Sequence, residues 1–410
     1  MSYDLVIRGA RRRDGRQVDI AIDGERYAAV AERVPDDGAQ ELDAAGRLVT
    51  ESFVIGQLHL DKVYTGPWID EAAKAEYFDE GTMGGAMTSI ELAARVKERY
   101  EEREILERVT RALELAVYGG VSHIRAFVDV DSTAKLKGIQ VCLQAREEFR
   151  DRLDLQVIAF PQDGIVREPG TEELLYGSMD LGADLVGGIP WIEYTDADMR
   201  RHVDIAFEVA KKYDVDISML VDDAGDPGLR STEYLALRTI EEGWEGRASA
   251  CHARAMSLYN EVYRRKLVAI LKRAGMGIVS NPHTAPLHVP IKELIAEGIP
   301  IGLGGESVND AYYPFGRNNM LEVVFVVSHM LWAMTPEDQE MLYDTVTIHP
   351  ATILRLPGHR IAEGNEANLT VLQHQTMRDV FTFHQEPRWV IYKGRVVAET
   401  EQSHKAPAAV

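Results

Sequence analysis

The chain has 410 residues, of which 45% are hydrophobic, and this is enough to build a sizeable core. Lysine and arginine together number 45 against 66 aspartates and glutamates, which gives a formal net charge of −21. So acidic a surface argues against nucleic acid and anionic membranes as partners, and a small-molecule substrate is expected instead.

The two cysteines, Cys142 and Cys251, stand far apart and in no metal-binding spacing. They predict no disulfide framework, which is typical of a protein of the reducing cytoplasm. The first residues lack the basic start and apolar run of a signal peptide, and no apolar run approaches the length of a membrane span. We therefore expect a cytoplasmic protein without a membrane segment. Monomer and homo-oligomer both stay open.

Both ends of the chain predict short strands. Apolar-rich runs at 3–7, 18–22 and 28–30 are separated by turn signals, and similar runs follow at 367–372, 389–392 and 395–398. We predict that residues 1–50 and 355–400 together form one small β-sandwich, followed by a loose tail at 401–410. Two separate edge hairpins on the main domain are the alternative.

The middle of the chain, residues 51–354, alternates strand-like and helix-like segments. Helical stretches such as 89–118 carry apolar residues at steps of three and four. Eight short apolar segments are each followed by polar residues, glycine or proline, and they end near Leu58, Val130, Phe160, Ile189, Val221, His252, Ser280 and Leu303. Eight strands alternating with helices predict an α/β fold, a (β/α)8 TIM-type barrel.

Polar side chains gather where these predicted strands end. The C-terminal ends of parallel barrel strands meet at one mouth, where such folds carry their chemistry. We therefore predict a pocket at this face of the barrel that brings together five residues from four strands: Gln57, His59, Gln162, His252 and Glu306.

Four ordered motifs carry a resemblance to a known family. They are Phe-Pro-Gln-x-Gly-Ile at 160–165, Gly-Ala-Asp-x-Val-Gly-Gly-Ile-Pro at 182–190, Met-Ser-x-Tyr-Asn at 256–260 and Asp-x-x-Tyr-Pro-x-Gly at 310–316. Together they resemble the cytosine deaminase branch of the amidohydrolase superfamily, which also holds enzymes that remove amino groups from triazine rings. The resemblance covers nearly the whole chain and implies a barrel with a flanking sandwich.

The resemblance also locates the family's metal ligands, and most of them are replaced. In the family, two histidines on the first strand, one on the fifth and an aspartate on the eighth bind a divalent metal. The matching positions here are Gln57, His59, Leu220 and Glu306. Catalytic zinc takes three protein ligands, whereas leucine offers none and glutamine offers only a neutral oxygen. We therefore expect no metal and no other cofactor.

Other positions of the family's pocket keep polar side chains. Asp223 matches the proton-shuttling glutamate, His252 the histidine that polarises water, and Gln162 the glutamine that binds the ring amide. Ser307 replaces a second aspartate, and Tyr312 replaces the tryptophan that stacks on the ring.

The expected roles follow from these matches. His59, Asp223, His252 and Glu306 are the candidate catalytic residues. The candidate substrate-binding residues are Gln57, Gln162, Asp222, Ser307 and Tyr312. Which of Asp222 and Asp223 faces the pocket stays open, since both could form a solvated turn. An ion pair with Arg254 or Lys62 is the alternative for Glu306.

Three functions compete at this point. The favoured hypothesis is a metal-independent enzyme that acts on a small polar nitrogen ring or amide, by C–N hydrolysis, ring opening or closure, or related acid–base chemistry. The first alternative is a metal-dependent deaminase with an atypical site. The second is a non-catalytic ligand-binding protein.

Overall fold

The structure, a computed structural model, describes residues 3–70 and 85–403. At its centre, eight parallel strands lie in the order β13-β12-β11-β10-β9-β8-β7-β6. Their bounds are β6 Phe53–His59, β7 Val121–Asp129, β8 Asp154–Phe160, β9 Leu185–Gly188, β10 Asp216–Val221, β11 Ala248–His252, β12 Ile278–Ser280 and β13 Ile301–Leu303.

The sheet closes between its first strand and the segment after its last strand. Leu58 and Glu306 form a parallel bridge. Around it, the His59 amide donates to the Glu306 carbonyl at 2.8 Å, and the Gly305 amide donates to the Gln57 carbonyl at 3.0 Å. This closure confirms the TIM-type barrel predicted from the sequence, and it places two predicted site strands side by side.

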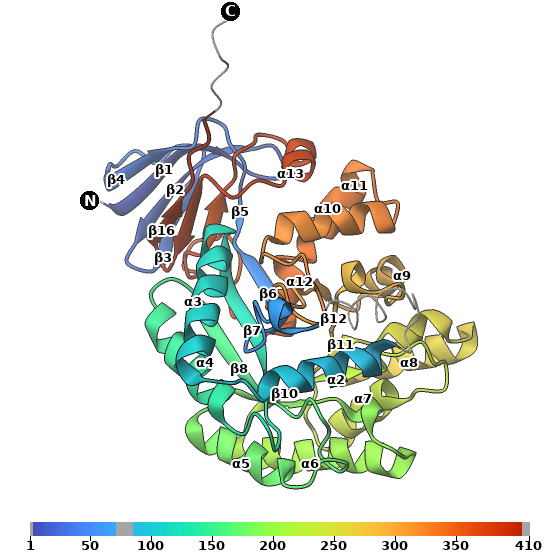
Figure 1. Ribbon diagram of the computed structural model, residues 1–410. Helices are drawn as coiled ribbons and strands as arrows, with labels where there is room; N and C mark the ends of the chain where they lie inside the picture. Colours follow the sequence, from blue (N-terminus) through green and yellow to red (C-terminus); the bar gives the residue numbers. More distant parts are fainter. Residues whose placement is uncertain (1–2, 71–84, 404–410) are drawn as a thin grey trace, which may run out of the picture.

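Helices surround the barrel (Figure 1). Their bounds are α3 Glu102–Tyr118, α4 Lys137–Phe149, α5 Thr171–Leu181, α6 Asp196–Tyr213, α7 Ser231–Glu241, α8 Glu261–Ala274, α9 Ile291–Ala296, α10 Met320–Met330, α11 Pro336–Asp344 and α12 Ile348–Ile353. Short 3₁₀ turns lie at Gly66–Trp68, Pro190–Ile192, Arg254–Leu258 and Pro282–Thr284. The last three directly follow strands and turn the chain at the mouth.

Helix α6 illustrates how the sequence builds this outer layer. Val203, Phe207 and Ala210, spaced by three and four residues, are buried on one face. The Thr195 hydroxyl caps the first turn by accepting from the amide of Asp198 at 3.1 Å. The helix ends at Asp214, whose φ of 55° lies in the left-handed region.

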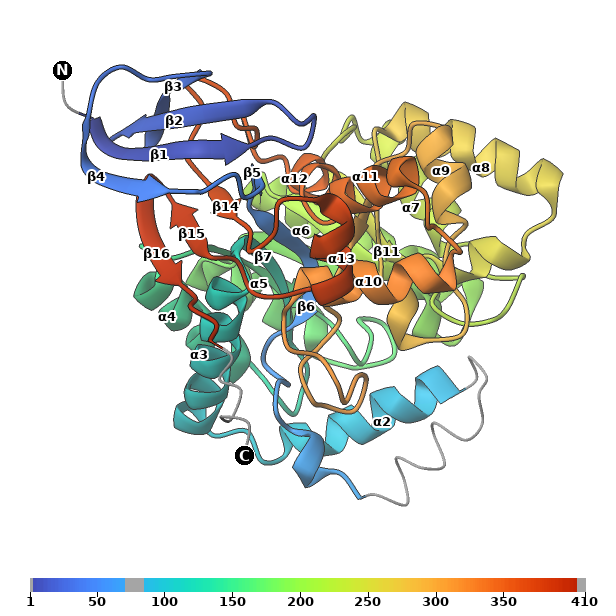
Figure 2. The same ribbon diagram turned by 90° about the horizontal axis from the view of Figure 1, so that it is seen from above.

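Helix α2 (Gly85–Lys97) lies across the mouth of the barrel, and a break before α3 divides the helical stretch expected at 89–118. Figure 2 shows α2 apart from the ring of outer helices. Ile90 of α2 is buried in the same apolar cluster as Phe127, Phe160 and Leu220, which line the barrel interior. The helix therefore shields the strand ends from solvent.

The two ends of the chain build two four-stranded sheets, ordered β3-β2-β1-β4 and β16-β15-β14-β5. Their bounds are β1 Tyr3–Arg11, β2 Gln17–Asp23, β3 Arg26–Ala31, β4 Gly38–Asp43, β5 Val49–Glu51, β14 Leu369–Val371, β15 Trp389–Tyr392 and β16 Arg395–Glu399, with helix α13 at Met377–Phe383. Leu5 and Ile20 share one buried core with Leu369 and Ile391, which confirms the joint β-sandwich.

Residues 404–410 of the expected tail lie outside the described residues, and 401–403 have no regular structure. Within the described ranges, every helix is too short or too polar to span a lipid bilayer.

Candidate active site

The five residues predicted to converge all lie at the C-terminal end of the barrel. Gln57 and His59 end β6, Gln162 follows β8, His252 ends β11, and Glu306 follows β13. All five are buried, and Glu306 is the most exposed at 5%. Contacts link His59 and His252 to Glu306 directly and Gln57 to Glu306 through Asn281. Gln162 lies at the same end of the barrel without a side-chain hydrogen bond to the others.

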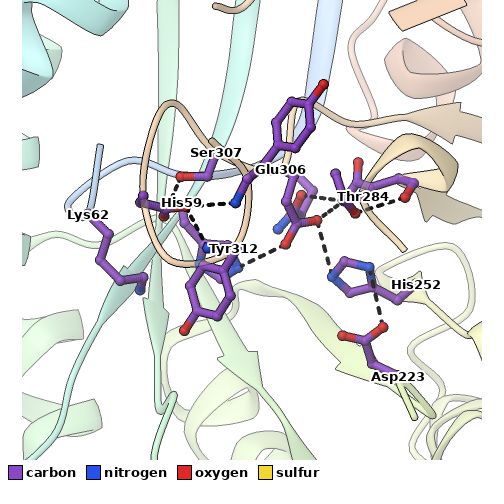
Figure 3. Close-up of polar contacts among 12 residues, drawn as sticks. His59, Lys62, Asp223, His252, Thr284, Glu306, Ser307 and Tyr312 are labelled. Carbon is purple, nitrogen blue, oxygen red and sulfur yellow. Dashed lines mark hydrogen bonds and ion pairs between the residues drawn. The ribbon is translucent and has the colours of Figure 1, made fainter. Parts of the chain in front are cut away.

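Glu306 stands between two imidazoles (Figure 3). Its Oε1 lies 3.9 Å from His59 Nε2, and its Oε2 lies 3.7 Å from His252 Nε2. Both Glu306 and His252 have left-handed backbones, with φ of 59° and 66°. Such conformations cost energy for residues other than glycine and are concentrated at functional sites.

Asn281 joins this group and was not selected from the sequence. Its Nδ2 donates to Gln57 Oε1 at 2.7 Å and to Glu306 Oε2 at 2.5 Å. The signal was available, because Asn281 directly follows Ser280, the last residue of β12, as the other site residues follow their own strands.

Arg254 organises the His252 side of the site. Its Nε donates to Asp223 Oδ1 at 2.5 Å, and its Nη2 donates to His252 Nδ1 at 3.1 Å. Because a guanidinium can only donate, Nδ1 of His252 is the acceptor and Nε2 carries the proton. That N–H therefore faces Glu306. The expected alternative, an ion pair between Arg254 or Lys62 and Glu306, is not the arrangement found, since Lys62 pairs with Asp129.

The two neighbouring aspartates differ in their contacts. Asp222 accepts from the amides of Ser231 and Thr232 at the start of α7, and from the hydroxyl of Tyr259 at 3.0 Å. Asp223 instead lies 3.6 Å from His252 Nδ1. We therefore revise the substrate-binding role expected for Asp222 to a structural one, because its oxygens are already occupied.

Burial keeps the central groups uncharged near neutral pH. It raises the pKa of Glu306 to about 8. It lowers the pKa of His252 to about 4 and holds the pKa of His59 well below its usual range. In each case removal from water disfavours the charged form. The site therefore holds a carboxylic acid between two neutral imidazoles at pH 7.

Several buried polar atoms here have no hydrogen-bond partner among the residues that the structure describes. They include Gln57 Nε2, His59 Nδ1, Gln162 Oε1, His252 Nε2 and Tyr312 OH. A buried donor or acceptor without a partner is costly, and a bound ligand or water is the usual remedy. Their presence at one end of the barrel marks a ligand site with both donors and acceptors.

Ser307 and Tyr312 form the side of the site next to His59. The Ser307 hydroxyl donates to Asp310, so its proton is already committed. The Tyr312 ring centre lies 5.0 Å from that of His59, and Lys62 Nζ lies 5.8 Å from the same tyrosine ring. The aromatic wall expected at Tyr312 therefore adjoins a cation.

A buried charge network supports this side from behind. Lys62 pairs with Asp129, and Lys97 of α2 donates to Asp131 at 2.7 Å and to Asp163 at 2.6 Å. Asp131 also accepts from the amides of Thr133 and Ala134 at 2.8 Å, so it holds both the local turn and Lys97.

The residues present do not fit the divalent metal that the fold family implies. Leu220 packs in the apolar cluster of the barrel interior and offers no donor. The oxygen of Gln57 is taken by Asn281, which leaves the amide nitrogen as the free atom. Within residues 3–70 and 85–403, no group of three or more histidine, cysteine or acidic side chains has a geometry able to hold a metal ion.

Comparison with known proteins gives the family. The model of the amidohydrolase family matches residues 82–398, more than half of the chain. The chain is 29% identical over 403 residues to N-isopropylammelide isopropyl amidohydrolase of Pseudomonas sp. (strain ADP), covering 97% of this chain and 98% of that protein. It is 24% identical over 413 residues to pterin deaminase of Rhizobium rhizogenes (strain K84 / ATCC BAA-868), covering 97% and 88%.

The fold likeness extends over the same length. 5-Methylcytosine deaminase from Klebsiella pneumoniae, liganded with 5-fluorocytosine, superposes with a TM-score of 0.89 at 27% identity, covering 98% of this chain and 99% of that one. The barrel closed at Glu306, the sandwich built from both termini and the extent of the family match lead to one conclusion: the chain belongs to the amidohydrolase family.

Proposed function

We propose that this protein hydrolyses a C–N bond of a small, polar nitrogen heterocycle, using acid–base chemistry of its own side chains and no metal. One observation carries the proposal: a buried carboxylic acid, Glu306, lies within 4 Å of two neutral imidazoles. The substrate class comes from relatives named for action on ammelide, pterin and cytosine rings.

The chemistry assigns one task to each group. Water adds to the ring carbon that bears the amine, and neutral His59 takes the proton that this water loses. Glu306 gives its proton to the ring or to the departing amine, so that the C–N bond breaks and a neutral amine leaves. Positioned acids and bases of this kind contribute about 10²- to 10⁴-fold to a rate. Ring opening or closure of a cyclic amide would use the same groups.

Substrate orientation falls to the free amide atoms. Gln57 Nε2 is a donor and Gln162 Oε1 an acceptor, and neither has a partner within residues 3–70 and 85–403. A ring with both a carbonyl and an N–H group would satisfy both. The Tyr312 ring, next to His59, is the surface on which such a ring would stack.

A panel of aminated rings tests the proposal. Protein purified without added metal is assayed for release of ammonia or amine from cytosine-, ammelide- and pterin-type rings, and its metal content is measured. We expect turnover of at least one ring, less than one equivalent of metal, and no loss of activity with chelator. Tightly held metal whose removal abolishes activity would favour the metal-dependent deaminase. Binding without turnover would favour a non-catalytic protein.

A double variant calibrates the metal measurement. Gln57→His with Leu220→His restores two imidazoles at the family's ligand positions, and we expect it to retain metal that the natural chain does not. Equal metal content in both proteins would contradict the ligand argument.

A further inference from the structure

We propose that Asn281 is a positioning residue that fixes the orientation of the Gln57 side-chain amide, so that Gln57 offers an N–H donor to the bound ring. The identity of the ring rests on the proposed function, whereas the orientation rests on contacts of the protein alone. The substrate must then place a hydrogen-bond acceptor, a carbonyl oxygen or an unprotonated ring nitrogen, against Gln57.

The orientation of Asn281 follows from its surroundings. Its amide nitrogen lies 2.5 Å from Glu306 Oε2, an oxygen whose identity does not depend on the orientation of an amide. Its Oδ1 packs on Gly304, where an added Cβ would lie only 2.4 Å away. If the amide were reversed, its NH₂ group would turn toward Gly304 and the donation to Glu306 Oε2 would be lost. The loss of a buried hydrogen bond is costly, so the observed orientation is favoured.

The orientation of Gln57 follows from that of Asn281. Since Asn281 presents an N–H group toward Gln57, the glutamine must accept the hydrogen bond through its side-chain oxygen. Its Nε2 is then left as a buried donor without a partner in the described part of the chain. His252 Nε2 is a second such donor, because Arg254 occupies the other ring nitrogen. The side of the site formed by β6, β11 and β12 therefore presents hydrogen-bond donors to the ligand. A metal site would instead present lone pairs of oxygen or nitrogen atoms.

Gly304 makes this arrangement possible. The lack of a side chain at Gly304 leaves room for Asn281 Oδ1. Gly304→Ala is therefore an independent way to displace the Asn281 amide without changing its chemistry.

Neutron diffraction on deuterated crystals tests the orientation without any ligand. In the natural protein we expect the deuterium atoms of Gln57 on the side away from Asn281. In Asn281→Asp the carboxylate can only accept hydrogen bonds. The Gln57 side-chain amide should therefore rotate by about 180° and donate to residue 281. If the Gln57 nitrogen of the natural protein carries deuterium that points toward Asn281, the proposal is overturned.

Calorimetry with two matched probes tests the consequence. The probes are pyrimidines that carry either an oxo or an amino group at the same ring position. We expect the natural protein to favour the oxo ring by about tenfold or more, Asn281→Asp to favour the amino ring, and Gly304→Ala to lose the preference. Asn260→Asp, an exposed helix cap, is the matched control and should keep the natural preference.

The two proposals fail in different ways. An unchanged oxo preference in both Asn281→Asp and Gly304→Ala would overturn the role of Asn281, even if the natural protein releases amines. An inverted preference without turnover of any ring would leave the role of Asn281 standing and overturn the proposed hydrolysis. If Asn281→Asp fails to fold, Gly304→Ala and the neutron structure of the natural protein still decide.

Discussion

At the scale of single residues, burial rather than charge pairing sets the chemistry of the site. Glu306 is accompanied by Asn281 and two imidazoles, and its protonated form is favoured because removal from water penalises the carboxylate. Arg254, the nearby cation, is held by Asp223 instead. The site can therefore store a proton at neutral pH and give it up during a reaction.

The pH dependence of activity tests this role. The pKa of Glu306 is about 8, so the acid is protonated below that pH and loses its proton above it. If it donates the proton, kcat should be flat below pH 8 and fall above it. Glu306→Gln should lower kcat by about 100-fold and abolish the limb near pH 8. Glu245→Gln, at an exposed position, should behave like the natural protein, and a rate that rises through pH 8 would make Glu306 a base.

The two neighbouring aspartates should separate stability from activity. Asp222→Ala removes the acceptor for two helix amides and a buried hydroxyl, and we expect a loss of about 3 kcal/mol of unfolding free energy. Asp223→Ala frees Arg254 from its carboxylate and should lower kcat with a smaller effect on stability. Denaturant titrations and steady-state kinetics of both variants distinguish the two roles. Equal effects on both quantities would contradict the assignment.

At the scale of secondary structure, helix α2 and its lysine close the mouth of the barrel. Lys97 reaches Asp131 and Asp163, which follow β7 and β8, while Ile90 covers the apolar interior. One lysine thus joins the helix to two strand ends beside the site.

Lys97→Ala should release α2 from the barrel. It leaves buried carboxylates without their cation, which costs about 3 to 5 kcal/mol when one partner of a buried pair is removed. We expect faster amide hydrogen exchange in α2 and a higher KM, with unchanged hydrogen exchange in the β-sandwich. Lys211→Ala removes a half-exposed lysine paired with Glu242 and serves as the matched control, with a change of about 0.5 kcal/mol or less. Unchanged exchange in α2 would show that apolar packing alone holds it.

At the scale of the whole molecule, the site lowers stability as pH rises. The unfolded chain ionises Glu306 near its ordinary pKa of 4.5, whereas the folded chain does so near 8. Below 4.5 both states are protonated, so Glu306 has no effect on the difference between them. Between the two values only the unfolded state gains from losing the proton, so folding becomes less favourable as pH rises.

Comparison with Glu306→Gln isolates this effect, because other titrating groups are common to both proteins. We expect the difference in unfolding free energy between the variant and the natural chain to grow, in favour of the variant, by about 1.4 kcal/mol per pH unit from pH 4.5 to 8. Above pH 8 the difference should stay constant. Chemical denaturation at a series of pH values measures the difference. A difference that stays constant across this range would contradict the raised pKa.

The sequence by itself determined the fold. Eight short apolar segments, each followed by polar residues, glycine or proline, predicted the barrel strands, and this local pattern located strand ends such as Val221, His252 and Ser280. The same rule pointed to the residues that converge at one face, because parallel strands carry their C-terminal ends to a common mouth. Their catalytic and binding roles stay predictions.

Only the tertiary structure decided how those residues pair. Asp222 and Asp223 are adjacent and chemically identical, yet one caps α7 and the other holds Arg254, because successive side chains leave the end of a strand in different directions. Asn281 contacts Gln57 from 224 residues away, and Lys97 of helix α2 reaches Asp163, which follows β8. Such contacts depend on barrel closure and on burial, which set the hydrogen-bond partners and pKa values that no local pattern of residues contains.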